Sequence, residues 1–122
     1  MKKRLATMTF LLSAGLSWGG SQIGPAKVIY VGAYGNGTLF IQVDLAITET
    51  GCNATSANSR MLVRKTHPSY NAYLTMATSS YVTGKKIMAK TNGCSAAGED
   101  PSGIFPVLDE TGSSYMLFNP AP

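Results

Sequence analysis

His67 is the only histidine in the 122-residue chain, and it is the first candidate for acid–base or nucleophilic chemistry. Hydroxyl groups stand near it at Thr66, Ser69 and Tyr70. A nucleophile needs a base within hydrogen-bond reach and a third group that orients the base, and sequence neighbours seldom supply that geometry. Pro68 also suggests a local role, since a proline can end a strand and Ser69 can cap the helix that follows. The pattern therefore favours a structural histidine.

Two pairs of adjacent carboxylates, Asp109–Glu110 and Glu99–Asp100, are the second candidates for acid–base chemistry. Adjacent strand residues point to opposite faces, so the first pair cannot easily share a substrate. The second pair precedes Pro101 and has the composition of a turn. The chain contains no phosphate-binding loop and no G-x-S-x-G, H-E-x-x-H or EF-hand motif. We therefore expect a protein that binds rather than catalyses, with no cofactor and no metal ion.

Cys52 and Cys94 are the only cysteines. They lack the Cys-x-x-Cys spacing, and His67 is the only imidazole that could complete a metal site, so a zinc ligand or a reactive thiol is disfavoured. In an oxidising compartment two cysteines most simply form one disulfide, which is what we predict. Closing a loop of this length would stabilise the fold by about 4 kcal/mol in the chain-entropy model.

Residues 1–19 have the order of a secretory signal peptide. Met1–Arg4 is basic, and the following run, Leu5–Ser17, is uncharged and largely apolar but too short to span a bilayer comfortably. Ser17 and Gly19 are small residues at the two positions that a signal peptidase reads. We predict cleavage after Gly19; a short buried helix is the other interpretation of this segment.

Cleavage after Gly19, or alternatively after Ser21, would leave residues 20–122 as a single domain in the periplasm or outside the cell. The leader contains three of the ten Lys and Arg residues, so seven remain in the mature domain against six Asp and Glu. Binding to nucleic acid or to an anionic membrane would need a clustered basic patch, which we do not expect here. No later apolar segment approaches membrane-spanning length, so we expect no membrane insertion.

Strand character dominates the first part of the domain. Lys27–Tyr34 is rich in β-branched and aromatic residues, and Gly35–Gly37 can form a tight turn. Thr38–Thr48 alternates between apolar and mixed positions, as a half-buried strand requires, and Arg60–Lys65 reads as a third strand. The expected buried face of the second strand consists of Leu39, Ile41, Val43, Leu45 and Ile47.

The apolar period changes to that of a helix between Ser69, a suitable cap, and Gly84, a suitable stop. Lys85–Thr91, Ile104–Glu110 and Ser114–Phe118 then read as further strands. The order of strands around one helix is that of the OB-fold. We predict a mainly β protein with one helix, an OB-like antiparallel barrel of five or six strands; a small open α+β sheet is the alternative. The expected inner face of the helix consists of Tyr70, Tyr73, Leu74, Ala77 and Tyr81.

The segment from Cys52 through "YNAYLTMATSSYVTGKKIMAKTNGCS" resembles a group of small exported bacterial proteins and, more remotely, the B subunits of AB-type toxins such as subtilase cytotoxin. The common pattern is a cysteine after the second strand, a small-residue helix that ends in glycine, and a basic-aliphatic strand with the partner cysteine. It covers less than half of the mature chain, and Ala96–Phe118 is longer than in the pattern. The resemblance implies an OB fold, a pentameric homo-oligomer, and a glycan or other cell-surface receptor as partner.

Two registers are open for the first hairpin. If Asn36–Gly37 is a two-residue turn, Tyr34 pairs with Leu39 and is buried among aliphatic residues. If the loop has three residues, Tyr34 pairs with Thr38, and the aliphatic residues of both strands gather on one side. We favour the second register because sorting apolar from polar residues is what fixes the pairing. The residues expected to point inward from the first strand are then Ile29, Val31 and Ala33.

In the favoured register the outer face of the hairpin carries aromatic rings beside hydrogen-bonding groups, and we predict that it binds a ligand. Flat rings can stack on the apolar face of a sugar, and the same mixture suits a protein interface. The leading hypothesis is a carbohydrate or cell-surface recognition module, and the alternative is a periplasmic interaction or inhibitor protein. It is also open that a neighbouring loop covers this face and makes it ordinary core. The predicted ligand-binding residues are Tyr30, Tyr34, Asn36, Phe40, Gln42 and Asp44.

Overall fold

The computed structural model describes residues 21–49, 51–52 and 59–118, and the structural statements below concern these residues. The predicted signal peptide, residues 1–19, lies outside them. The elements are β1 (Ser21–Ala26), β2 (Val28–Ala33), β3 (Leu39–Val43), β4 (Arg60–Val63), α2 (Tyr70–Thr83), β5 (Ile87–Thr91) and β6 (Tyr115–Phe118).

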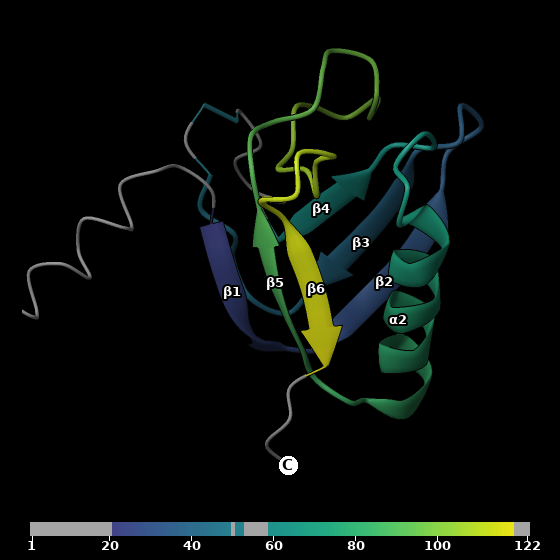
Figure 1. Ribbon diagram of the computed structural model, residues 1–122, viewed down its shortest axis with the longest axis vertical. Coiled ribbons are helices and arrows are strands. Elements are labelled where there is room, and N and C mark those ends of the chain that lie inside the picture. The colour runs from purple at the N-terminus through teal and green to yellow at the C-terminus, as the bar shows by residue number, and fades with distance from the viewer. Residues whose placement is uncertain (1–20, 50, 53–58, 119–122) are drawn as a thin grey trace, which may run out of the picture.

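The strands form two three-stranded antiparallel sheets, one in the order β1-β5-β6 and the other in the order β2-β3-β4 (Figure 1). Lys27 alone separates β1 from β2, so one continuous stretch of chain contributes its first half to one sheet and its second half to the other. Figure 1 shows α2 alongside β2, at one side of the molecule. The prediction of a mainly β fold with one helix is therefore confirmed, although neither sheet closes on itself in the described part of the chain.

A short segment of the β5–β6 connection bridges the two sheets. The Leu62 N–H, in β4, donates to the carbonyl of Pro106 at 3.0 Å, and the Leu108 N–H donates to the carbonyl of Leu62 at 2.9 Å. On the other side, the Asn92 N–H, just after β5, donates to the carbonyl of Val107 at 2.9 Å. Backbone groups of this segment thus pair with both neighbours, as buried backbone must.

The structure shortens several predicted strands. The strand expected over Thr38–Thr48 ends at Val43, and the one expected over Ile104–Glu110 is present only as isolated bridges. Leu45, which we expected to be buried, is 43% exposed because the alternation stops where β3 ends. β1 was not expected, since its sequence, SQIGPA, contains a glycine and a proline, both of which are unusual in strands.

The register of the first hairpin is the one that we favoured. Tyr34 donates its N–H to the carbonyl of Thr38 at 2.9 Å, and Tyr30 lies opposite Gln42. A bulge then shifts the pairing, so that Val28 rather than Ile29 turns inward. Our placement of Ile29 in the core was therefore wrong: it is 38% exposed, whereas Val28 is 3% exposed. Of the other two residues expected to point inward, Val31 packs partly against the core and Ala33 is exposed.

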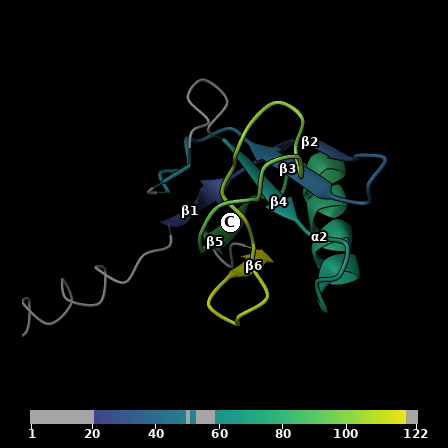
Figure 2. The ribbon, with the colours of Figure 1, turned by 90° about the horizontal axis from the view of Figure 1, so that it is seen from above.

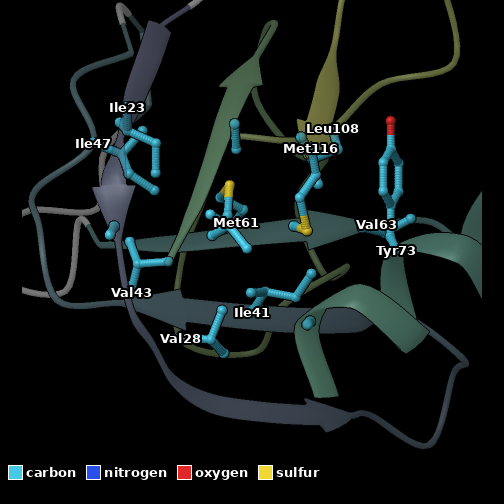
Figure 3. Packing of buried hydrophobic residues seen from close by; sticks show 14 of the residues in the cluster. Ile23, Val28, Ile41, Val43, Ile47, Met61, Val63, Tyr73, Leu108 and Met116 are labelled. Atoms are coloured by element: carbon cyan, nitrogen blue, oxygen red, sulfur yellow. The ribbon is translucent and has the colours of Figure 1, made fainter. Parts of the chain in front are cut away.

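The main core lies between the two sheets and α2. Figure 3 shows side chains from β1, β3, β4 and the helix pointing toward one another, with Met61 near the centre. Ile41 and Met61 are completely buried, and Ile47, after the end of β3, still reaches this core. Burial of the alternate β3 residues is as the sequence predicts, because one face of the strand meets the core and the other does not.

Helix α2 ends where predicted: Gly84 has a φ of +80° and donates its N–H to the carbonyl of Ser80 at 2.8 Å. Seen from above, α2 stands at one end of the sheet β2-β3-β4 (Figure 2). Its buried residues are Tyr73, Ala77 and Ser80, whereas Tyr81, expected on the inner face, is 56% exposed. Ser80 takes the inner position because its hydroxyl donates to the Lys85 carbonyl at 2.6 Å, which makes a polar side chain tolerable there.

The predicted disulfide is present. Cys52 and Cys94 are bonded, with their Cα atoms 5.5 Å apart, and the bridge closes a loop with a sequence separation of 42. No helix in the described part of the chain is long and apolar enough to cross a membrane.

Candidate functional site

The predicted ligand-binding residues separate into three groups in the structure. Tyr30, Gln42 and Asp44 lie on the open part of the outer hairpin face. Tyr34 and Phe40 lie under a loop, and Asn36 is a turn residue.

Tyr30, Gln42 and Asp44 form an open surface that we call the Tyr30 face. Tyr30 is 60% exposed and lies directly opposite Gln42, so their side chains are neighbours on the outer side of the sheet. Asp44 follows two residues after Gln42 and is exposed. One of its carboxylate oxygens, Oδ1, accepts the backbone N–H of Lys27 at 2.9 Å, which fixes the carboxylate beside the bulged start of β2.

A partly buried arginine organises the next part of the outer face. Arg60, opposite Gln42 in the pairing of β3 with β4, donates from Nη1 to the hydroxyl of Tyr34 at 2.8 Å and to Oδ2 of Asp100 at 3.0 Å. Its guanidinium lies over the rings of Phe40 and Phe105, at 4.9 and 5.1 Å from the ring centres. We call Tyr34, Phe40, Arg60, Asp100 and Phe105 the Arg60 cluster.

The loop that contributes Asp100 and Phe105 covers the rings of Tyr34 and Phe40. Phe105 is 2% exposed and forms a second small core with Leu62 and Val107, against which Phe40 packs. The rings of Tyr34 and Phe40 are 5.0 Å apart. This part of the predicted ligand surface is therefore packed against the protein itself, which is the covered arrangement that the sequence left open.

Electrostatics hold Asp100 in its charged form. Burial by itself would raise the pKa of this carboxyl, but hydrogen bonds from Ser102, Tyr34 and Arg60 outweigh burial and lower the pKa below its ordinary value. Burial and the hydrogen bond to Asp100 raise the pKa of Tyr34, so its hydroxyl stays protonated and donates to Oδ2 of Asp100 at 2.8 Å. The Arg60 cluster thus contains an ion pair in which the side chain of Asp100 has no exposed surface.

A second arginine holds the same loop from the end of β4. Arg64 donates from Nε to Glu99 at 2.7 Å and from Nη1 to Glu110 at 3.0 Å. The expected turn at Glu99–Asp100 is present, because Asp100 accepts the backbone N–H of Ser102 at 2.8 Å. Both acidic residues also pair with arginines of β4 or its extension, which the turn interpretation did not foresee.

Asn36 stabilises the hairpin turn rather than the open face. Its Oδ1 accepts the N–H of Thr38 at 2.9 Å, and its Nδ2 donates to the carbonyl of Glu99 at 3.4 Å. Side-chain bonds of this kind are typical of asparagine in turns. Asn36 therefore joins the turn to the loop that covers Tyr34.

Both ring nitrogens of His67 form hydrogen bonds with backbone groups. Nδ1 accepts the N–H of Ser69 at 2.9 Å, and Nε2 lies 2.8 Å from the carbonyl of Asp109. Because a carbonyl can only accept, Nε2 must carry the proton. Residues 21–49, 51–52 and 59–118 contain no group of three or more His, Cys, Asp or Glu side chains that could hold a metal ion. This geometry agrees with a structural histidine.

The sequence did not reveal the pairing of Arg60 with Asp100. Arg60 lies at the start of β4, yet its side chain is only 19% exposed, and its Nε is buried without a hydrogen-bond partner among the described residues. Its spacing from Arg64 places both on one face of an extended strand, which could have pointed to a common acidic partner.

Comparisons of the chain with protein-family models, with curated proteins and with solved structures found no match.

Proposed function

We propose that this chain is an exported, non-catalytic binding module that recognises a carbohydrate or another cell-surface ligand at the Tyr30 face. The observation that carries the proposal is Tyr30, 60% exposed and opposite Gln42 in the hairpin, with the exposed Asp44 two residues beyond Gln42. A ring with two rotatable angles offers a large contact area at a low cost in conformational entropy. The amide and the carboxylate add a hydrogen-bond donor and acceptors to the same surface.

The absence of catalysis is supported by how the titratable side chains are used. His67 contacts backbone through both ring nitrogens, and Asp100 accepts bonds from Arg60 and Tyr34. Asp109 accepts bonds from Asn92 at 2.8 Å and from the hydroxyl of Ser114, also at 2.8 Å. Hydrogen bonds outweigh the effect of burial and lower the pKa of Asp100 and of Asp109, which makes both carboxylates weak bases.

We further propose that the two sheets form an OB-like barrel. Support comes from the continuous β1–β2 stretch, which contributes to both sheets, and from the segment around Val107, which pairs with β4 on one side and with the end of β5 on the other. Amide hydrogen exchange tests this idea. The N–H groups of Leu62 and Leu108 should be as protected as those inside β3, and rapid exchange at both would leave two separate sheets.

Export is proposed from the leader-like residues 1–19 and is supported by the disulfide, which fits an oxidising compartment. β1 begins at Ser21 and pairs with Thr91 there, so cleavage after Gly19 would leave the strand whole. Mass spectrometry of the exported chain should show Gly20 as its first residue. Cleavage after Ser21 would contradict this position, and an intact leader would contradict export itself.

The recognition function is tested on an array of immobilised glycans with the labelled mature chain and two tyrosine variants. Tyr30→Ala removes the ring of the Tyr30 face, whereas Tyr81→Ala removes a ring that is 56% exposed on α2 and serves as the matched control. We expect the wild type and Tyr81→Ala to bind the same glycans and Tyr30→Ala to lose them. An array without any signal at high micromolar protein concentration would contradict the carbohydrate proposal.

A protein partner, such as an enzyme to be inhibited or further copies of the chain, is the second candidate. It is favoured by Ile29, which the bulge exposes next to Tyr30, because exposed apolar and aromatic neighbours are common in interfaces. Light scattering coupled to gel filtration shows whether the chain is an oligomer or a monomer in solution. A stable ring would favour the oligomer that the toxin resemblance implies, and Ile29→Ser should then weaken it. A monomer that binds no glycan would favour the interaction protein.

A further inference from the structure

We infer that Arg60 is a positioning residue that locks the Gln42 amide with its NH₂ group toward solvent, so that the Tyr30 face selects a neutral ligand with adjacent hydroxyl groups. The inference rests on the proposed function and adds the class of ligand and the device that selects it.

The orientation of the Gln42 amide follows from the chemistry of its partner. Arg60 donates from Nη2 to Oε1 of Gln42 at 3.2 Å, and a guanidinium has donors only, so the amide oxygen must be the atom that faces it. The NH₂ group therefore points away from Arg60. This NH₂ group makes no hydrogen bond to the described residues and is not buried, so it reaches water.

The arginine can hold this amide because it is itself fixed. Its Nη1 donates both to Tyr34 and to the fully buried carboxylate of Asp100. The rings of Phe40 and Phe105 stand over the guanidinium at 4.9 and 5.1 Å, which restricts its tilt. If the Gln42 amide were rotated, its NH₂ group would face the N–H groups of the Arg60 guanidinium, and no acceptor would lie between these donors. The outward direction of the NH₂ is thus set by the Arg60 cluster rather than by solvent.

Asp44 supplies the complementary half of the site. It follows Gln42 by two positions and lies one residue past the end of β3, where it is exposed. Its Oδ1 is occupied by the N–H of Lys27, whereas no hydrogen bond among the described residues uses its Oδ2. The surface therefore offers a fixed donor at Gln42, opposite Tyr30, and an anchored anionic acceptor at Asp44, just past the end of β3.

This combination favours hydroxyl groups over other ligand groups. A hydroxyl can accept from the Gln42 amide and donate to the Asp44 carboxylate, and neighbouring hydroxyls on one ring can do both at once. An anionic ligand group would be repelled by Asp44, and an apolar ligand would leave the amide unpaired. Stacking on Tyr30 adds an apolar ring face to the requirement. A neutral pyranoside meets all three conditions.

The positioning role can be tested without a ligand, because the chain has only two glutamines. Gln22, exposed on β1, provides a reference for the side-chain NH₂ signals of Gln42 in proton–nitrogen correlation spectra. We expect the Gln42 signals of the wild type to be displaced from those of Gln22 and to move toward them in Arg60→Lys, which keeps the charge but loses the planar fork. Coincident signals for the two glutamines in the wild type would overturn the positioning role. If Arg60→Lys does not fold, the comparison of the Gln42 signals with the Gln22 signals in the wild type is sufficient to test the positioning role.

The ligand class is tested in the same spectra with methyl glycosides of glucose, galactose and mannose. At least one should shift the Gln42 NH₂ signals of the wild type, and Gln42→Glu should weaken its binding about tenfold. Gln42→Glu still accepts from Arg60 and should fold, but it cannot donate. Equal binding by Gln42→Glu would overturn the donor role while leaving the Tyr30 face intact. A wild type that responds to none of the glycosides but shows displaced Gln42 signals would refute the ligand class and retain the positioning role.

Discussion

Arg60 and Asp100 are 40 residues apart in the sequence, yet Nη1 of Arg60 lies 3.0 Å from Oδ2 of Asp100. The pair joins the start of β4 to the loop after β5, and the same guanidinium holds the amide of Gln42. One buried ion pair therefore closes the loop over Tyr34 and Phe40 and also shapes the part of the face that stays open.

Asp100→Ala should destabilise the protein strongly. It would leave Arg60, whose Nε already lacks a partner, as an uncompensated charge in a largely buried position, and breaking buried pairs in this way costs about 3–5 kcal/mol. Equilibrium unfolding in urea measures the loss. The control is Glu110→Ala, which removes the partner of Arg64 whose side chain is 33% exposed and should cost at most about 1 kcal/mol. Equal losses for both variants would contradict the assignment of the buried pair.

Acid should weaken the fold through Asp100 and Asp109. Hydrogen bonds outweigh the effect of burial and hold the pKa of each below the ordinary value of 3.8. The unfolded chain therefore takes up protons first as the pH falls, so the free energy of unfolding is highest above about pH 5 and declines below about pH 4. Asp100→Asn and Asp109→Asn, measured in urea across this range, should each flatten the decline. A decline equally steep in both variants would locate the acid sensitivity elsewhere.

Gly32→Ala should destabilise the outer face by overpacking. A Cβ on Gly32 would lie 2.4 Å from Cζ of Phe40, whose ring covers the glycine, and relieving such a clash costs about 1–3 kcal/mol. Gly35→Ala is the matched control, because nothing lies within 4 Å of a Cβ at that position. The double variant with Phe40→Leu should recover part of the loss. Thermal melting of the four proteins, wild type included, checks the order, and tolerance of Gly32→Ala would show that Phe40 does not rest there.

The Cys52→Ser/Cys94→Ser variant should lose about 4 kcal/mol of stability, because the bridge closes a loop with a sequence separation of 42. The wild type with its disulfide reduced should unfold at the same urea concentration as the variant. A loss below about 1 kcal/mol in both would mean that the unfolded chain is not restricted by the bridge as the loop model assumes.

Local patterns were sufficient to predict several features from the sequence. The register of the first hairpin could be predicted because only one of the two pairings places the aliphatic residues of both strands on the same side of the hairpin, and that pairing is the one observed. The end of the helix could be predicted from Gly84, since few other residues accept its backbone conformation. The disulfide followed from an even number of cysteines. Each of these depends on residues close in sequence or on a simple count.

The candidate site could be predicted only in part, because its geometry depends on contacts distant in the chain. Nothing in the alternation reveals the bulge that exposes Ile29, since one extra residue in a strand leaves no mark of its own. Tyr34 and Phe40 were correctly placed outside the main core, but the loop that covers them comes from beyond β5. Sequence spacing cannot place that loop. Ser80 likewise takes the inner helix position expected of Tyr81, where its hydroxyl donates to the carbonyl of Lys85 and accepts the N–H of Val28.

If Tyr30 is the recognition ring and Phe40 belongs to the folded interior, Tyr30→Ala and Phe40→Ala should have opposite effects, which urea unfolding and binding to the glycan array measure. Tyr30→Ala should change stability by less than about 0.5 kcal/mol and abolish binding, whereas Phe40→Ala should cost about 3 kcal/mol because its ring packs on buried Leu62 and Phe105. A Tyr30→Ala protein that still binds, or one that loses as much stability as Phe40→Ala, would contradict these roles of the two rings.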